Sequence, residues 1–443
     1  MLFRSAPLLA LETELDLGLL LGDLGRTDEA LELLDAAAAE FERLGDARGA
    51  AWAAKNRGFA LFTARRYAEA VPALEHAWRV GAELGVPFLE GVGALGVAEA
   101  LAYGGGEGDA RVEAALATAE RIARARHERQ LEWRAAALRG RLALARGEYE
   151  PALAELTRAT RLIERWRRRL GASGLVEHAL RARSDPYRDA AFAAARLGRG
   201  ETALAFAEQL EARVLDELCA RDEAPLDVGA PEIEALRARI GSLEYTARES
   251  GAGAEELARA EDELDATQLE LELASGRTLV SASERLALEA LRTGMRAQAL
   301  DVALTYLVGT EGTLALRVDA QSPEVRCVWL APGRARIQEL VERLRVPLER
   351  LEAGELDLAH LGFDVRAARE LYDGLVRPLA LADGARIALV RDEVLAAIPF
   401  ELFVAGGELG RFDAERPFAH LAGLSWFGDE HALVAYGSLA RLA

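Results

Sequence analysis

The chain has 443 residues, of which 51% are hydrophobic and 29% charged, which excludes wholesale disorder and predicts several packed cores. Its 73 acidic residues outnumber the 54 basic ones, and the net charge of −19 argues against general nucleic-acid binding. No apolar run reaches the roughly 18 residues of a membrane span. The two cysteines, Cys219 and Cys327, cannot form a disulfide framework, so a reducing, cytoplasmic location is expected.

A pattern of small residues recurs through the first half of the chain. Four positions return 40 residues later with the same residue type, namely Gly18 and Gly58, Ala30 and Ala70, Leu34 and Leu74, Ala37 and Ala77. Further copies follow at Gly140, Ala152, Leu156 and Ala159, and weaker ones at Ala98, Ala110 and Ala117 and at Ala191, Ala203 and Ala207.

The spacing predicts that each unit is a pair of amphipathic helices joined by a short turn. The small residue of the first helix and the first alanine of the second are expected where the two helices cross, because only Gly or Ala lets the backbones approach so closely. The leucine and the second alanine are expected to face the next unit. One unit cannot bury its apolar face alone, so several must stack into an α solenoid. A generic Ala-rich helical bundle is the alternative.

These units resemble the tetratricopeptide repeat family over roughly residues 10–220, with a period longer than the standard unit. The resemblance implies a repeat array over residues 1–220 that binds a protein or peptide on its concave face. Gly91, Gly93 and Gly96 form a literal G-x-G-x-x-G, but they follow a repeat helix rather than a strand, so helix crossings are expected there. The only lysine, Lys55, is not preceded by glycine, which excludes a Walker A phosphate loop.

Residues 221–297 are predicted to form a helical spacer. Apolar residues recur at steps of three, four and seven on either side of a breaker at 251–253, namely Ile233, Leu236, Ile240, Leu243, Leu257, Leu264 and Leu271. This spacing favours two long helices folded back on one another, and a further helix is expected from Ser281. A membrane-surface helix is the alternative, but the apolar stripe is narrow and the polar face is mainly acidic.

From about residue 298 the pattern becomes that of an α/β or α+β domain. Three segments rich in β-branched and aromatic residues, at 300–308, 313–318 and 325–331, predict an antiparallel meander. Helices are expected at 334–352 and 363–381, and a buried strand at 386–392. Strands separated by helices make residues 298–443 a domain of mixed class.

Short motifs of this region resemble the CHAT family of caspase-like cysteine peptidases, whose members are often fused behind tetratricopeptide repeats. Ala303–Tyr306 resembles the first strand of that family's domain. The other blocks, in the family's order, are Leu371-Tyr372, Pro378-Leu379, the apolar strand Ile387–Val390, Asp392, Leu395, Pro399-Phe400 and Leu402. The resemblance implies a repeat array that senses a protein or peptide and passes a conformational change to a peptidase domain.

The sequence departs from that family where catalysis is concerned. The family's Pro-Asp-Gly reads Arg391-Asp392-Glu393 here, and the tyrosine block reads Tyr436–Leu439. In the family, the catalytic His-Gly and Ser-Ala-Cys motifs follow that block, and neither occurs in this sequence. A cysteine peptidase needs a thiolate beside an imidazole. We therefore predict no catalytic residue, the first part only of a caspase-like domain, and a C-terminal fragment as the partner that completes it.

No other chemistry is indicated. Cys327, whose side chain is predicted to share a strand face with Val325 and Trp329, is expected to be inert, and so is Cys219 at the end of a repeat helix. No HExxH, CxxC or GxSxG motif occurs, and no metal ligand, cofactor-binding residue or cofactor is predicted. The six histidines are His76, His127, His178, His360, His420 and His431, and none of them matches the family's catalytic position.

Two function classes remain. The first is a sensing repeat module coupled to a CHAT-type peptidase domain. The second is a non-enzymatic interaction scaffold with a degenerate CHAT-like segment, which the departures at Arg391 and Glu393 favour. A transcriptional regulator is a weaker third reading, because no helix-turn-helix with a basic recognition face is visible.

Overall fold

The computed structural model describes residues 5–106, 108–126, 128–170, 185–219, 231–250, 256–257, 259–260, 263–264, 267, 288–355, 363–411 and 419–442. The chain divides into two compact units. Unit 1 comprises Met1–Gly171 and Asp227–Leu271, and unit 2 comprises Ala172–Leu226 and Glu272–Ala443. This division groups the helical hairpin before residue 220 with the α/β part of the chain, and the domain boundaries at 220 and 297 stay predictions.

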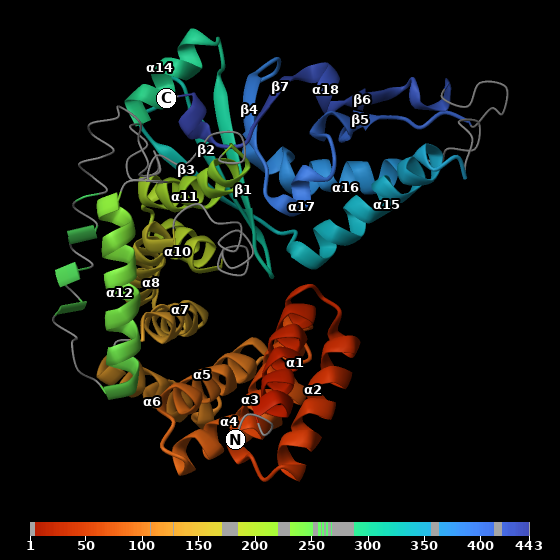
Figure 1. The fold of residues 1–443 in the computed structure, drawn as a ribbon. Coiled ribbons are helices and arrows are strands. Elements are labelled where there is room, and N and C mark those ends of the chain that lie inside the picture. The colour runs from red at the N-terminus through yellow and green to blue at the C-terminus, as the bar shows by residue number, and fades with distance from the viewer. Residues whose placement is uncertain are drawn as a thin grey trace. The chain divides into compact units, whose positions relative to one another are not determined.

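Unit 1 contains stacked helical hairpins, as the repeat pattern predicts (Figure 1). Each helix of a hairpin packs on its partner and on the next hairpin. The turns between helices contain a residue in the left-handed backbone conformation, which glycine adopts without strain. Gly45 (φ 75°) and Gly85 (φ 63°) are examples, whereas Arg65 (φ 59°) takes this conformation without being glycine. The helices are α1 (Ser5–Asp23), α2 (Thr27–Arg43), α3 (Ala47–Thr63), α4 (Tyr67–Glu83), α5 (Pro87–Tyr103), α6 (Ala110–Arg126), α7 (Arg129–Ala145) and α8 (Tyr149–Leu170).

The recurring glycines lie at helix crossings, but their closest neighbour differs from the prediction. A Cβ on Gly18 would lie 2.6 Å from the Leu34 side chain, and one on Gly58 would lie 2.5 Å from Leu74 Cγ. The leucine of the second helix is thus the closest neighbour, because the larger side chain reaches furthest across the crossing. The first alanine lies at the crossing as well, since a Cβ on Gly140 would lie 3.2 Å from the backbone oxygen of Ala152. Leu74 also meets the next hairpin at Gly96, as predicted for this position.

The glycines of the apparent dinucleotide motif lie within α5, and each faces a neighbouring helix. A Cβ on Gly93 would lie 2.6 Å from the backbone nitrogen of Trp78, and one on Gly91 would lie 2.7 Å from the Leu131 side chain. The prediction of helix crossings is therefore confirmed, since these glycines are needed for close packing.

The predicted spacer hairpin is seen in part. Ile233, Leu236 and Ile240 of α12 (Pro231–Ser250) pack in one apolar cluster with Leu257, Ala260 and Leu264. Arg239 pairs with Glu256 and Glu263 at 3.4 Å on the surface of this cluster. The leucine pattern on both sides of the breaker thus describes one packed seam, except for Leu271, which lies outside the described residues.

Unit 2 is built on a five-stranded mixed sheet of order β3-β2-β1-β4-β7. The meander β1–β2–β3 is antiparallel, as predicted, while β4 and β7 add to β1 in parallel. A two-stranded ribbon, β5–β6, accompanies it. The strands are β1 (Val302–Val308), β2 (Thr313–Asp319), β3 (Val325–Leu330), β4 (Arg386–Val390), β5 (Val404–Gly407), β6 (Leu424–Trp426) and β7 (Ala432–Tyr436).

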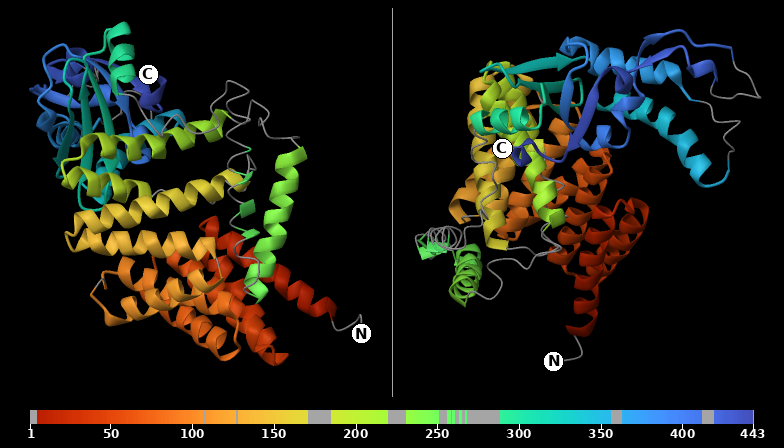
Figure 2. Two further views of the ribbon diagram at one scale, coloured as in Figure 1. Left: turned by 90° about the vertical axis from the view of Figure 1, so that its left-hand side faces the viewer. Right: turned by 90° about the horizontal axis from the view of Figure 1, so that it is seen from above.

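Helices cover both faces of the five-stranded sheet (Figures 1 and 2). On one face, Leu304 and Tyr306 share an apolar core with residues of α15 (Arg334–Glu352) and α16 (Val365–Leu375). The opposite face lies against α10 (Asp185–Arg196) and α11 (Gly200–Cys219). The remaining helices are α14 (Leu288–Ala297), α17 (Glu393–Ala396), α18 (Phe427–Glu430) and the short turns η4 (Arg377–Leu379), η5 (Phe400–Leu402), η6 (Ala419–Leu421) and η7 (Leu439–Arg441).

Candidate functional site

The first helices of successive hairpins in unit 1 form a continuous surface. Helices α1, α3, α5 and α7 pack on one another in this order, whereas the second helices make no comparable contact with each other among the described residues. Helices that lie closer together line the inner side of a curved stack. We call the surface of α1, α3, α5 and α7 the first-helix face.

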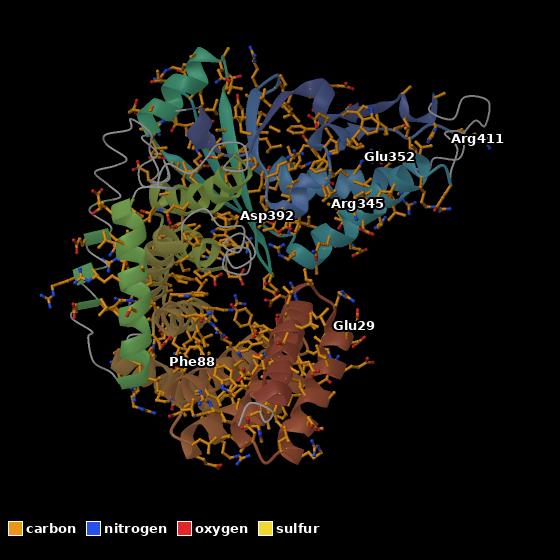
Figure 3. The ribbon with its side chains drawn as sticks, viewed as in Figure 1. Glu29, Phe88, Arg345, Glu352, Asp392 and Arg411 are labelled. Carbon is orange, nitrogen blue, oxygen red and sulfur yellow. The ribbon has the colours of Figure 1, made fainter. Side chains whose placement is uncertain are left out.

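Three side chains of α3 gather on the first-helix face. Trp52, Lys55 and Phe59 are spaced at i, i+3 and i+7, which places them on one side of the helix. The Lys55 ammonium lies 4.8 Å from the Trp52 ring centroid and 5.8 Å from that of Phe59. Trp52 stacks in turn on Phe88 of α5, which Figure 3 labels, with ring centroids 5.9 Å apart.

Lys55 is half-buried in this surface and has no ion pair among the described residues. Burial is the main cause that lowers its pKa, to about 8, and the nearby Arg134 lowers it further. Asp16 and Asp23 of α1 act in the opposite direction but do not compensate. A substantial fraction of this amine is therefore neutral at mildly alkaline pH, unlike an ordinary lysine.

A salt bridge completes the polar part of the first-helix face. Arg134 of α7 binds Glu99 of α5 through two parallel hydrogen bonds, of which Nε to Oε1 measures 3.0 Å. The Arg134 guanidinium also lies 5.0 Å from the Phe59 ring centroid. Aromatic rings, a lysine and a fixed bidentate pair thus line one surface, and such a surface suits a protein segment that offers both apolar and polar side chains.

In unit 2, Asp392 is a charged residue of the sequence motifs that is buried and held by several polar contacts. It follows β4 (Figure 3) and is 2% exposed. Its Oδ2 accepts the backbone N–H of Val308 at 3.0 Å, and Oδ1 accepts that of Val394 at 3.3 Å. Arg188 Nη2 lies 3.5 Å from Oδ2, and Arg334 Nη2 lies 3.7 Å from Oδ1.

The position of Asp392 is defined by sheet topology. Strands β1 and β4 are parallel neighbours, so their carboxyl ends meet at one edge of the sheet. Open α/β sheets bind ligands and carry reactive groups at this edge. Here the carboxylate is already engaged by backbone donors and two arginines, so it joins the ends of β1 and β4 rather than acting as a general base.

The structure brings no cysteine and histidine together among the described residues. Cys327 is half-buried on β3, on the face of Val325 and Trp329, and burial raises the pKa of its thiol. His431 directly precedes β7, and its Nδ1 lies 3.3 Å from the Ala385 carbonyl oxygen. Because β3 and β7 are opposite edges of the sheet, about 19 Å of strand spacing separates them.

The other residues weighed from the sequence are placed as follows. His76 lies on α4, with Nδ1 3.2 Å from Arg79 Nη2, and His420 lies in η6. His127, His178 and His360 lie outside the described residues, as does the side chain of Cys219. Within the described part of the chain there is no metal-binding group of acidic, His and Cys side chains, and no helix has the length and apolarity to span a membrane.

Sequence reasoning missed the surface around Lys55. Lys55 was used only to exclude a phosphate loop. Its i, i+3, i+7 spacing with Trp52 and Phe59 was the signal in the sequence that could have indicated a shared surface. The roles of Phe88 and Arg134 could not be read locally, because they come from other hairpins. Asp392 was identified through motif resemblance, but its two arginine partners lie 204 and 58 residues away in sequence.

Comparison with known proteins gives one family match. Residues 9–80 match the tetratricopeptide repeat family. This segment covers most of the hairpins α1–α2 and α3–α4, with two of the recurring glycines and Lys55. The comparison with curated proteins gives no match.

Proposed function

We propose that this protein is a protein- or peptide-sensing repeat module, that the first-helix face of unit 1 holds the partner, and that the α/β unit is of the CHAT type. The observation that carries the first part is the half-buried cluster of Trp52, Lys55, Phe59 and Phe88 on that face. Tetratricopeptide repeats imply protein partners in general, and their match over residues 9–80 supports this reading. We further propose a cytoplasmic location.

The test of binding is a selection of random peptides on the full chain, followed by affinity measurement. Peptides that bind the first-helix face should lose at least about tenfold in affinity for Trp52→Ala, since buried aromatic anchors carry much of a binding energy. Leu84→Ala is the matched control, because Leu84 is 48% exposed at the end of a second helix. Selected peptides that bind both variants as tightly as the wild type would refute this location of the site.

The CHAT-type reading is supported by the burial of the motif blocks in one core. Leu371, Leu379, Ile387, Leu395 and Phe400 come from five separate elements and belong to the same apolar cluster. The residues that resemble the family's blocks thus act together as the packing core of unit 2, which is the role expected of motifs that define a fold.

The β7 edge of the sheet favours the addition of a further strand from another polypeptide segment. Strand β7 pairs with β4 on one side, and no described strand pairs with its other side. Its sequence, ALVAY, has no charge, and Val434 is 41% exposed. Uncovered apolar edges of this kind promote pairing with another chain. A C-terminal fragment that supplies this strand and the His–Cys pair would make the assembly a regulated cysteine peptidase.

The decisive experiment for the peptidase part is to sequence the source DNA beyond the codon of Ala443, together with the intact mass of the native protein. Downstream His-Gly and Ser-Ala-Cys segments would support the peptidase, and co-expression of that fragment should then give cysteine-dependent cleavage of a peptide. Without such segments, the non-enzymatic scaffold is the better proposal. The scaffold is favoured by Arg391, which departs from the family motif and donates to the Ile398 carbonyl oxygen at 3.2 Å.

A further inference from the structure

The α10–α11 hairpin is bound to the sheet of unit 2 by specific contacts as well as by apolar packing. Phe192 packs edge-on against Trp329 of β3, with ring centroids 5.4 Å apart, and the Arg196 guanidinium lies 3.9 Å from the centroid of the same indole. Gly200 approaches β3 so closely that a Cβ there would collide with the Val325 carbonyl oxygen. These contacts hold the hairpin against β3 as a single unit.

The first polar anchor of the hairpin lies at the carboxyl ends of β1 and β4. Arg188 of α10 is 14% exposed and reaches Asp392, whose carboxylate also accepts the N–H of Val308. Since Asp392 lies between β4 and α17, Arg188 links α10 to the segment that follows β4.

The second polar anchor lies after β7. Glu208 of α11 is fully buried, and its Oε2 accepts the Ser438 hydroxyl at 2.7 Å and the Ala440 N–H at 3.0 Å. Its other oxygen has no hydrogen-bond partner among the described residues, and burial raises the pKa of the carboxyl group. A buried carboxyl with an unsatisfied oxygen destabilises the fold unless its remaining bonds compensate. The two hydrogen bonds of Oε2 therefore join α11 to the turn after β7.

We propose that the α10–α11 hairpin is a relay which, through Arg188 and Glu208, couples the segment after β4 to the segment after β7. Strands β1, β4 and β7 are parallel, so both segments belong to the same edge of the sheet. One rigid hairpin holds both, and a displacement of either anchor is transmitted to the other. This inference rests on the proposed function, to which it adds that the α10–α11 hairpin passes a conformational change to the α/β unit.

The test is hydrogen exchange with mass spectrometry on the full chain, in peptides that cover residues 386–396 and 432–442. Arg188→Ala should raise exchange about tenfold in 386–396, where its contact is lost, and at least about threefold in 432–442. Glu208→Ala should raise exchange about tenfold in 432–442 and at least about threefold in 386–396. The control is Glu201→Ala, an exposed residue in the first turn of the same helix, which should change neither segment.

The crossed effects decide the proposal, because energetic coupling between two sites must act in both directions. If each variant changes only the segment that it contacts, the anchors are independent and the relay is overturned. Should Glu208→Ala fail to fold, Ser438→Ala removes the same bond from the other side, and a lack of change in 386–396 would equally overturn the relay. The measurement needs neither a peptide ligand nor a C-terminal fragment, so its failure is distinguishable from failure of the proposed function.

Discussion

Replacement of Asp392 tests how the α/β unit holds the ends of β1 and β4. Asp392→Ala removes the acceptor of the Val308 N–H and leaves the guanidinium groups of Arg188 and Arg334, which are 14% and 23% exposed, without their buried partner. Loss of one member of a buried charged network costs about 3–5 kcal/mol. Asp392→Asn keeps an acceptor for Val308 but loses the charge, so we expect a smaller cost of about 1–2 kcal/mol.

The assay is hydrogen exchange of β1 in increasing urea, because it reports the opening of unit 2 irrespective of unit 1. A loss of 3 kcal/mol raises the opening constant on the order of 100-fold. Asp373→Ala is the control, because Asp373 is 45% exposed and its ion pair with Arg377 contributes less than about 1 kcal/mol. A cost below about 1 kcal/mol for Asp392→Ala, or an equal cost for both Asp392 variants, would refute this account of the buried carboxylate.

Three further predictions concern single residues of both units. Lys55→Met should stabilise unit 1 by about 2 kcal/mol at pH 7, because the folded state lowers the pKa of Lys55 to about 8 and the unfolded chain holds the proton up to its ordinary value. The stability of the wild type should therefore rise between about pH 8 and pH 10.5 relative to that of the variant. Urea unfolding at pH 7 and pH 10.5 measures this, and the same stability difference between variant and wild type at both pH values would contradict the prediction. Gly58→Ala should destabilise unit 1 by about 1–3 kcal/mol, because its Cβ would lie 2.5 Å from Leu74 Cγ, whereas Gly241→Ala in α12 has open space and should stabilise by up to about 1 kcal/mol. Thermal unfolding of the two alanine variants checks this pair, and equal shifts would count against the crossing. Cys327 should react with a thiol reagent at pH 8 more slowly than a free cysteine, because burial raises its pKa, and a rate equal to that of glutathione would disprove it.

Local pattern was sufficient where a structural element depends on its own residues. The helices of the repeat units follow from the recurrence of Gly18, Leu34 and their copies, and the meander β1–β3 follows from its β-branched residues. The helix α15 spans Arg334–Glu352, the range that its periodicity predicts. The positions of the glycine crossings were predicted, but the leucine as the closest neighbour was not, because the side chain that fills a gap depends on the angle between two helices.

The helical repeats and the α/β character of the last third follow from local sequence patterns. The contacts between side chains are seen only in the folded chain, namely Lys55 with the rings of Trp52 and Phe59, Asp392 with Arg188, and Glu208 with Ser438. Hydrophobic periodicity is a property of neighbouring residues, whereas a buried charge needs a partner, which can come from any part of the chain that the fold brings close. Glu208 and Ser438 are 230 residues apart, and no local pattern relates them.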